Sequence, residues 1–351
     1  MKIIFITGTM IHGGAERVIS ILSSKLVENY DVDILCYYSA PVFYSVDSRV
    51  NIIDISKDWN CTNFFNKAAA LRKYVKSQEN AIVIAFMMPF YIFAAISLIG
   101  DKTPFIAAER NDPSSASKVR QVLSKLLLPK YDVLVAQTQG AKAFFENNNL
   151  CELRVIYNPV NPLLLNIEHK DPAEKHFISL ARFNPQKNQK LLISAFKRVL
   201  ETHPDSKLTI YGEGPLRNEL QEQIDSLGIH NSVFLPGVTN NITEAFSNAS
   251  VYVCSSDYEG MPNSVIEAMV CGMPTISTRV MGSVDLIQDG ENGLLVEVGN
   301  EDELVCAMNK LIEDKEMRMK FSHNARSIAN LLDTDAIVKQ WEDTIECALG
   351  K

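Results

Sequence analysis

Two glutamates stand in the segment SSDYEGMPNSVIEAMVCGMPTI (residues 255–276), one on each side of a Pro-Asn-Ser run. Apolar residues recur at helical spacing after this run and predict a helix that begins near Pro262 or Asn263. A helix start presents unpaired N–H groups and a partial positive charge, which favour a bound phosphate. Glu267 follows Glu259 into the helix, where its carboxylate could accept hydrogen bonds from hydroxyl groups. The arrangement predicts a ligand that carries both phosphate and hydroxyl groups.

A second loop supplies cations. ARFNPQKNQ (residues 181–189) follows a predicted strand and contains Arg182 and Lys187. Arg as a planar fork and Lys as a point charge could together clamp a diphosphate. The alternative is a solvated loop with two unrelated cations.

Two glycine-rich loops also follow predicted strands. TGTMIHGGA (residues 7–15) contains Gly13 and Gly14, which would let the backbone approach a phosphate closely. YGEGPLR (residues 211–217) contains Gly212 and Gly214. Tight turns without a ligand would explain both loops equally well. His12 is the histidine nearest to these loops, and a solvated loop histidine is the simpler interpretation.

The strands and helices that must position these loops form two series. Apolar strands alternate with helical patterns, which predicts parallel sheets covered on both faces. The pattern breaks in a proline-rich, polar linker at residues 158–176. We expect an α/β fold with two Rossmann-like domains facing a central cleft, the first over residues 1–165 plus a crossover helix at 335–351, and the second over 166–334.

Composition excludes several classes of protein. Residues 1–165 carry a net charge of +3 and residues 166–351 one of −11, and the acidic second half argues against a nucleic-acid partner. Seven scattered cysteines without a CxxC pair indicate reduced thiols in a cytoplasmic protein. The first ten residues are too short an apolar run for a signal peptide. The uncharged stretch 81–99 is interpreted as a buried strand–loop–helix unit, not a membrane span.

The motifs together resemble glycosyltransferase family 4, a family of retaining enzymes with the two-domain GT-B fold. Glu259-x7-Glu267, with EGMPNSVIEAM between and CGMPTI after, is similar to the family signature. ARFNPQKN, YGEGPLR, FLPG and the early Gly-Gly loop fall in the family's order, so the resemblance covers nearly the whole chain.

The resemblance implies a role for each matching position. Arg182 and Lys187 would bind the donor diphosphate, and Glu259 would contact the donor sugar. The amides near Asn263 and Ser264 would hold the same phosphates or the sugar. The other implied donor-site positions are Glu267 for the ribose, Gly13 and Gly14 from the first domain, and Gly212, Gly214, Pro236 and Gly237 near the base.

One loop departs from the family pattern. Many members have a histidine where this chain has AAERNDP (residues 107–113). Glu109, Arg110 and Asn111 stand there instead and become candidate contacts to the sugar or the acceptor.

Transfer is favoured over hydrolysis on chemical grounds. A glycosidase needs one carboxyl group to protonate a poor leaving group. A nucleoside diphosphate leaves as a stabilised anion and needs cations and helix-start amides instead. No metal or other cofactor is expected, because the two DxD-like triplets (31–33 and 333–335) open a strand or lie in a polar turn.

The segment PSSASKVRQVLSKLLLPKY (residues 113–131) bears on the acceptor. It carries Lys118, Arg120, Lys125 and Lys130, no acidic residue, and apolar residues at helical spacing. Such a basic amphipathic helix can lie on an anionic membrane surface, where a polyprenyl-diphosphate-linked glycan would be presented. The alternative is a helix packed on the core with a solvated basic face.

We therefore expect a retaining glycosyltransferase that moves a hexose or N-acetylhexosamine from a nucleotide-diphosphate sugar, with UDP favoured as the carrier, in surface polysaccharide biosynthesis. It would be cytoplasmic, with peripheral attachment to the inner membrane. A nucleotide-sugar epimerase of the same architecture and a non-catalytic assembly protein remain alternatives. A dehydrogenase is disfavoured because the chain lacks GxGxxG and its acidic partner.

Overall fold

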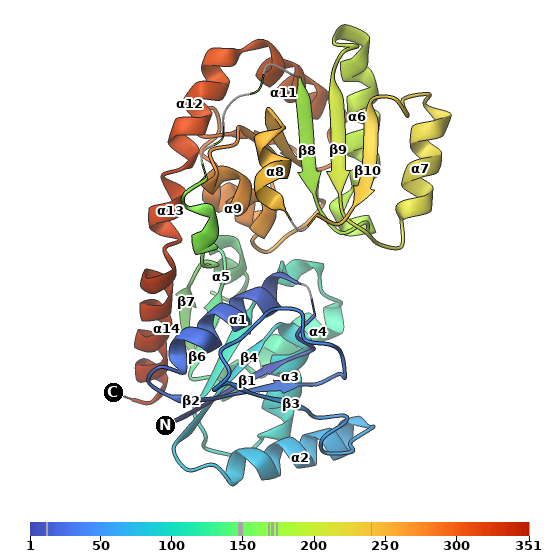
Figure 1. The fold of residues 1–351 in the computed structure, drawn as a ribbon. Coiled ribbons are helices and arrows are strands. Elements are labelled where there is room, and N and C mark those ends of the chain that lie inside the picture. The colour runs from blue at the N-terminus through green and yellow to red at the C-terminus, as the bar shows by residue number, and fades with distance from the viewer. Residues whose placement is uncertain are drawn as a thin grey trace. The chain divides into compact units, whose positions relative to one another are not determined.

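The computed structural model describes residues 1–11, 13–146, 150–167, 169, 172, 175–239 and 241–350. The chain forms two compact units (Figure 1). Domain 1 comprises Met1–Pro159 and Thr334–Lys351, and domain 2 comprises Val160–Asp333. The first boundary lies earlier than residues 165/166, because Val160 already bonds within domain 2, where its backbone N–H donates to the carbonyl of Leu332 at 2.9 Å.

Domain 1 is built on a parallel sheet in the order β3-β2-β1-β4-β5-β6-β7 (Figure 1). The strands are β1 (Lys2–Thr7), β2 (Asp31–Cys36), β3 (Asn51–Asp54), β4 (Ala81–Phe86), β5 (Phe105–Glu109), β6 (Val133–Ala136) and β7 (Glu152–Val155). The helices are α1 (Gly14–Leu26), α2 (Phe64–Lys76), α3 (Met88–Ser97), α4 (Lys118–Leu126), α5 (Gln139–Phe145) and α14 (Thr334–Ala348), with short 3-10 turns at Pro113–Ser115 and Leu128–Lys130.

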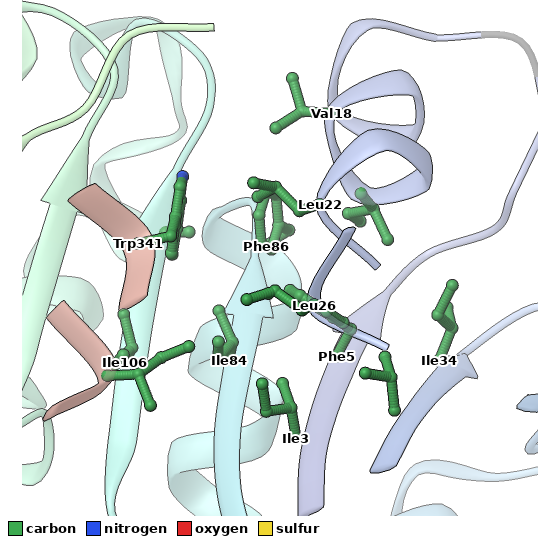
Figure 2. Close-up of a cluster of buried hydrophobic side chains, with 14 of the residues drawn as sticks. Ile3, Phe5, Val18, Leu22, Leu26, Ile34, Ile84, Phe86, Ile106 and Trp341 are labelled. Carbon is green, nitrogen blue, oxygen red and sulfur yellow. The ribbon is translucent and has the colours of Figure 1, made fainter. Parts of the chain in front are cut away.

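The last helix of the chain completes the core of domain 1. Trp341 of α14 is fully buried, and its ring stacks on Phe86 of β4 with centroids 5.6 Å apart (Figure 2). Apolar residues of α1, among them Leu22 and Leu26, pack into the same cluster. A segment more than 170 residues away in the sequence is therefore part of the first domain's hydrophobic core.

Most of the uncharged stretch 81–99 is buried in domain 1, as the sequence predicts. It forms β4, which is buried throughout, and α3, most of whose residues are also buried. Among the described residues, no helix has the length and hydropathy to cross a membrane.

Domain 2 contains a second parallel sheet in the order β10-β9-β8-β11-β12-β13. The strands are β8 (His176–Leu180), β9 (Lys207–Tyr211), β10 (Val233–Gly237), β11 (Val251–Cys254), β12 (Thr275–Thr278) and β13 (Leu294–Val296). The helices are α6 (Gln189–Thr202), α7 (Arg217–Ser226), α8 (Ile242–Ser247), α9 (Asn263–Val270), α10 (Met281–Leu286), α11 (Glu301–Glu313), α12 (Lys315–Ala325) and α13 (Ile328–Leu331), with 3-10 turns at Pro162–Leu164 and Pro185–Lys187.

Short elements such as β3 and α10 were not expected from the sequence. β3 is the edge strand of domain 1, and its residues are only partly buried, so they lack the apolar run that marks the central strands. α10 has six residues, too few to show a helical period. Both lie beside longer elements that fix their positions.

Candidate functional site

The candidate residues of domain 2 gather at one edge of its sheet. Arg182 and Lys187 follow β8, Gly212 and Gly214 follow β9, and Glu259 follows β11. The strands are parallel, so their carboxyl ends lie at the same edge, where open α/β sheets bind ligands.

Lys187 and Glu259 form an ion pair at this edge. Their side chains are only 17% and 9% exposed, so water screens the pair weakly. The Glu259 carboxylate also accepts a hydrogen bond from the Ser256 hydroxyl at 2.8 Å and one from the Gln186 amide at 3.3 Å. The Glu259 carboxylate is thus bound by three side chains, those of Lys187, Ser256 and Gln186.

Backbone and side-chain bonds fasten the loop after β8 to the loop after β11. The Ser255 hydroxyl donates to the carbonyl of Lys187 at 3.0 Å, and the Gln186 amide donates to the carbonyl of Tyr258 at 2.8 Å. The backbone N–H of Asp257 donates to the carbonyl of Gln186 at 2.8 Å. Ser256 and Gln186 were not identified from the sequence, because their roles depend on two loops about 70 residues apart meeting at one place.

Arg182 differs from Lys187. Its side chain is exposed, and within the described part of the chain its guanidinium has no hydrogen-bond or ion-pair partner. The side-chain amide of Gln189 donates a hydrogen bond to the backbone carbonyl of Arg182 at 2.8 Å. The backbone of Arg182 is therefore held in place while its guanidinium group faces solvent. A guanidinium group in this position is available to bind an anion.

The predicted helix start is observed at α9. Pro262 is its N-cap residue, and no side chain caps the helix. Glu267 is buried within α9, with 6% of its surface exposed. The amides that begin at Asn263 and Ser264 therefore lie at a helix start whose partial positive charge is not offset by an acidic residue in the first turn.

Gly282, at the second position of α10, packs against the turn that precedes α9. A methyl group at Gly282 would lie 2.3 Å from the carbonyl oxygen of Gly260, 2.5 Å from Cα of Met261 and 2.8 Å from the Pro262 ring. Only glycine permits α10 to approach the turn before α9 so closely. This residue was not singled out from the sequence, because its neighbour is about 20 residues away.

The glycines after β9 allow two loops to pack together. A methyl group at Gly212 would lie 1.9 Å from the Ala181 carbonyl oxygen, and one at Gly214 would lie 2.4 Å from that of Phe183. The N–H of Gly212 donates to the carbonyl of Gly237 at 2.9 Å, so Pro236 and Gly237, predicted to form a turn, lie at the end of β10 beside this loop. Close backbone packing accounts for these glycines without a ligand.

The glycine loop of domain 1 precedes α1. Gly13 is the N-cap residue and has an extended backbone that any residue can adopt, so its conformation does not by itself require glycine. No side chain caps α1, and Gly14 is exposed. His12 lies outside the described residues.

The loop that replaces the family histidine is buried at the end of β5. Glu109 accepts hydrogen bonds from the N–H groups of Arg110 (3.0 Å) and Asn111 (3.1 Å) and from the Tyr91 hydroxyl (2.8 Å). Burial raises the pKa of Glu109 to about 7, although these hydrogen bonds act to lower it. Burial also lowers the pKa of Arg110 to about 9. Glu109 therefore shapes the loop, and its oxygens are already occupied by protein donors.

The cations of residues 118–130 differ in exposure and in their contacts. Lys118 and Arg120 are exposed on α4. Lys125 lies 4.0 Å from the ring centre of Phe144, and Lys130 donates to the carbonyl of Asp101 at 2.6 Å. The helix ends at Leu126, so Lys130 lies outside it, whereas Lys125 lies within it and contacts a ring of domain 1.

The apolar residues of α4 are also not in the core. Val119, Val122 and Leu126 are 69%, 57% and 69% exposed. We call these three residues the α4 stripe. The helix therefore exposes apolar side chains as well as the solvated basic face that the alternative interpretation expects.

The first DxD-like triplet is part of the structure of domain 1. Asp33 of β2 is buried, pairs with Lys2 at 3.0 Å and accepts a hydrogen bond from the Tyr74 hydroxyl. Within the described residues, no group of three or more His, Cys, Asp or Glu side chains could hold a metal ion.

Sequence comparisons find glycosyltransferases similar to this chain. The family described as glycosyl transferases group 1 matches residues 163–328, which span most of domain 2. A protein of Campylobacter jejuni, N-acetylgalactosamine-N,N'-diacetylbacillosaminyl-diphospho-undecaprenol 4-alpha-N-acetylgalactosaminyltransferase, is 29% identical over 96% of both chains. A second one, GalNAc-alpha-(1->4)-GalNAc-alpha-(1->3)-diNAcBac-PP-undecaprenol alpha-1,4-N-acetyl-D-galactosaminyltransferase, is 26% identical over 97% of both chains.

The fold is also that of a solved structure. HepE of Anabaena, in complex with UDP, matches with a TM-score of 0.82 at 20% identity, over 99% of this chain and 100% of that chain. The likeness establishes two parallel-sheet α/β domains of the GT-B type.

Proposed function

The chain is a glycosyltransferase with the GT-B fold, and we propose that it is a retaining enzyme of family 4. It transfers a hexose or N-acetylhexosamine from a UDP-sugar to a polyprenyl-diphosphate-linked glycan in surface polysaccharide biosynthesis. The observation that carries the proposal is the uncapped start of α9 at the same sheet edge as Arg182 and the Lys187–Glu259 pair.

The chemistry of the leaving group supports this assignment. A departing nucleoside diphosphate develops negative charge, which cations and helix-start amides stabilise. Arg182 has no protein anion to neutralise it, so it can pair with a phosphate group. Glu267 would accept hydrogen bonds from the ribose, and Glu259, oriented by Lys187 and Ser256, would contact the donor sugar.

The acceptor class is supported by the relatives and by the surface of α4. Both Campylobacter jejuni relatives are named for undecaprenyl-linked substrates. The α4 stripe with Lys118 and Arg120 joins exposed apolar area to positive charge, and residues 113–131 contain no acidic residue. Such a surface is complementary to anionic lipid headgroups above an acyl layer, so we propose peripheral attachment to the cytoplasmic face of the inner membrane through α4.

Reversing two charges on α4 tests the attachment. Each Lys or Arg near an anionic surface contributes about 1 kcal/mol, so Lys118→Glu with Arg120→Glu should weaken binding to phosphatidylglycerol vesicles by at least roughly 30-fold in co-sedimentation. Lys73→Glu with Lys76→Glu, two exposed positions on α2, is the matched control because it changes the net charge equally. Equal losses in both pairs, or no loss in the α4 pair, would contradict docking through α4.

A ligand screen followed by a transfer assay tests the activity itself. A UDP-sugar present at 100 times its dissociation constant should stabilise the protein by about 2.7 kcal/mol, whereas GDP- and ADP-sugars at the same concentration should have a smaller effect. Transfer to a polyprenyl-diphosphate-linked glycan should persist in EDTA and give a product with the anomeric configuration of the donor. An inverted product would refute retention, loss of activity in EDTA would refute metal independence, and epimerisation of the donor alone would refute transfer.

A further inference from the structure

Buried N–H donors without acceptors gather at the carboxyl edge of the domain 1 sheet. Within the described residues, Nε and Nη2 of Arg110, Nε2 of Gln137 and Nε1 of Trp341 have no hydrogen-bond partner. These side chains are at least nine-tenths buried, with 8%, 1% and 0% of their surface exposed. A buried donor left unpaired costs about 1–3 kcal/mol, so a cluster of them requires an explanation.

The sheet register places Arg110 and Gln137 at neighbouring strand ends, and Trp341 lies beside Arg110. Glu109 of β5 pairs with Ala136 of β6, so Arg110 and Gln137 are the next residues at two neighbouring strand ends. The guanidinium carbon of Arg110 lies 5.8 Å from the ring centre of Trp341. Figure 2 shows the indole nitrogen of Trp341 at the end of the ring that points away from Ile106, toward the carboxyl end of the sheet.

No carboxylate of the described residues forms a direct ion pair with Arg110. Its Nη1 atom donates to the carbonyl of Ile156 at 3.3 Å, and its guanidinium carbon lies 5.2 Å from the ring centre of Phe86. The neighbouring carboxylate of Glu109 is already bonded to two backbone N–H groups and the Tyr91 hydroxyl. A buried water could accept some of these hydrogen bonds but would add no negative charge beside Arg110, whereas an anion would supply both acceptors and charge.

We propose that Arg110, Gln137 and Trp341 form an oxyanion site that binds one phosphate group of a diphosphate ligand. The guanidinium fork matches two phosphate oxygens, and the amide and indole N–H groups supply further donors. The carboxyl edge of an open α/β sheet is where such ligands bind. This inference rests on the proposed function and adds a phosphate-binding site to it. The proposed reaction uses two diphosphates, one in the donor and one in the acceptor.

Trp341 provides a local reporter for this site. The chain has two tryptophans, so Trp59→Phe leaves Trp341 as the only one. Titration of this variant with inorganic pyrophosphate should give a saturable change in tryptophan emission. Adding Arg110→Met, which retains a long apolar side chain without the charge, should weaken the apparent affinity by roughly ten- to a hundredfold.

A second variant and a control keep the binding test independent of folding. Gln137→Glu places a negative charge at the site and should weaken pyrophosphate binding further, without removing the Arg110 side chain. Arg72→Met is the matched control, because Arg72 lies in the same domain and, among the described residues, its side chain donates only to the carbonyls of Ser97 and Ile99. No saturable change in emission, or an equal change in the Arg110→Met protein, would overturn the proposal.

Steady-state kinetics then identify the source of the phosphate. Arg110→Lys should raise KM about tenfold for only one substrate: the polyprenyl-diphosphate acceptor if the site holds the acceptor, or the UDP-sugar if it holds the donor. Unchanged KM values for both would refute the site. The emission titration requires no turnover, so it can fail or succeed independently of the proposed transferase activity.

Discussion

Replacing Lys187 by methionine will destabilise domain 2 and nearly abolish sugar transfer. The substitution leaves the Glu259 carboxylate buried without its cation, and breaking a buried ion pair costs about 3–5 kcal/mol. It also removes a charge that would stabilise the leaving diphosphate, and loss of one such group lowers kcat by about 100- to 1,000-fold. Urea unfolding and initial-rate kinetics on the same preparation measure the two effects.

A double-mutant cycle separates the structural role of this pair from its role in catalysis. Glu259→Gln retains an oxygen that can accept the hydrogen bond from Ser256 and removes the buried charge. The double variant should therefore recover most of the stability lost in Lys187→Met but none of the activity. Lys190→Met is the matched control, because its pair with Glu219 is about half exposed and should contribute no more than about 1 kcal/mol. Recovery of transfer in the double variant would show that the pair is only structural.

Replacing Gly282 by alanine will impair donor binding while domain 2 stays folded. The added methyl group would overlap the Gly260 carbonyl, Met261 Cα and the Pro262 ring, none of which can rotate away as a flexible side chain would. The turn before α9 must shift, so its N–H groups leave their positions, and we expect KM for the UDP-sugar to rise at least about tenfold. The expected cost in stability is about 1–3 kcal/mol.

Val284→Ala is the control for this substitution. Val284 lies on the same helix and is half exposed, so its truncation changes α10 without affecting the turn before α9. Isothermal titration with UDP compares the two variants with the unmodified protein. Equal affinities in all three would mean that Gly282 does not position the helix start.

The sequence by itself determined the elements that depend on local patterns. Apolar strands alternating with amphipathic helices predicted two parallel-sheet domains, because central strands such as β4 are buried on both faces and are therefore apolar along their length. The start of α9 was predicted for the same reason, since a proline followed by helical spacing is contained within one short segment. The resemblance of residues 259–267 to a family signature likewise required only residues close together in the chain.

The tertiary structure decided how residues far apart in the sequence meet. Lys187 pairs with Glu259, Gly282 lies against Met261, and Trp341 completes a core that begins at the N-terminus. The exposed α4 stripe could not be predicted either, because the same apolar spacing describes a helix that packs on a core and one that faces solvent. Such contacts depend on strand order and sheet register, which bring together loops that are far apart in the sequence. The local sequence of each loop does not indicate which other loop it will contact.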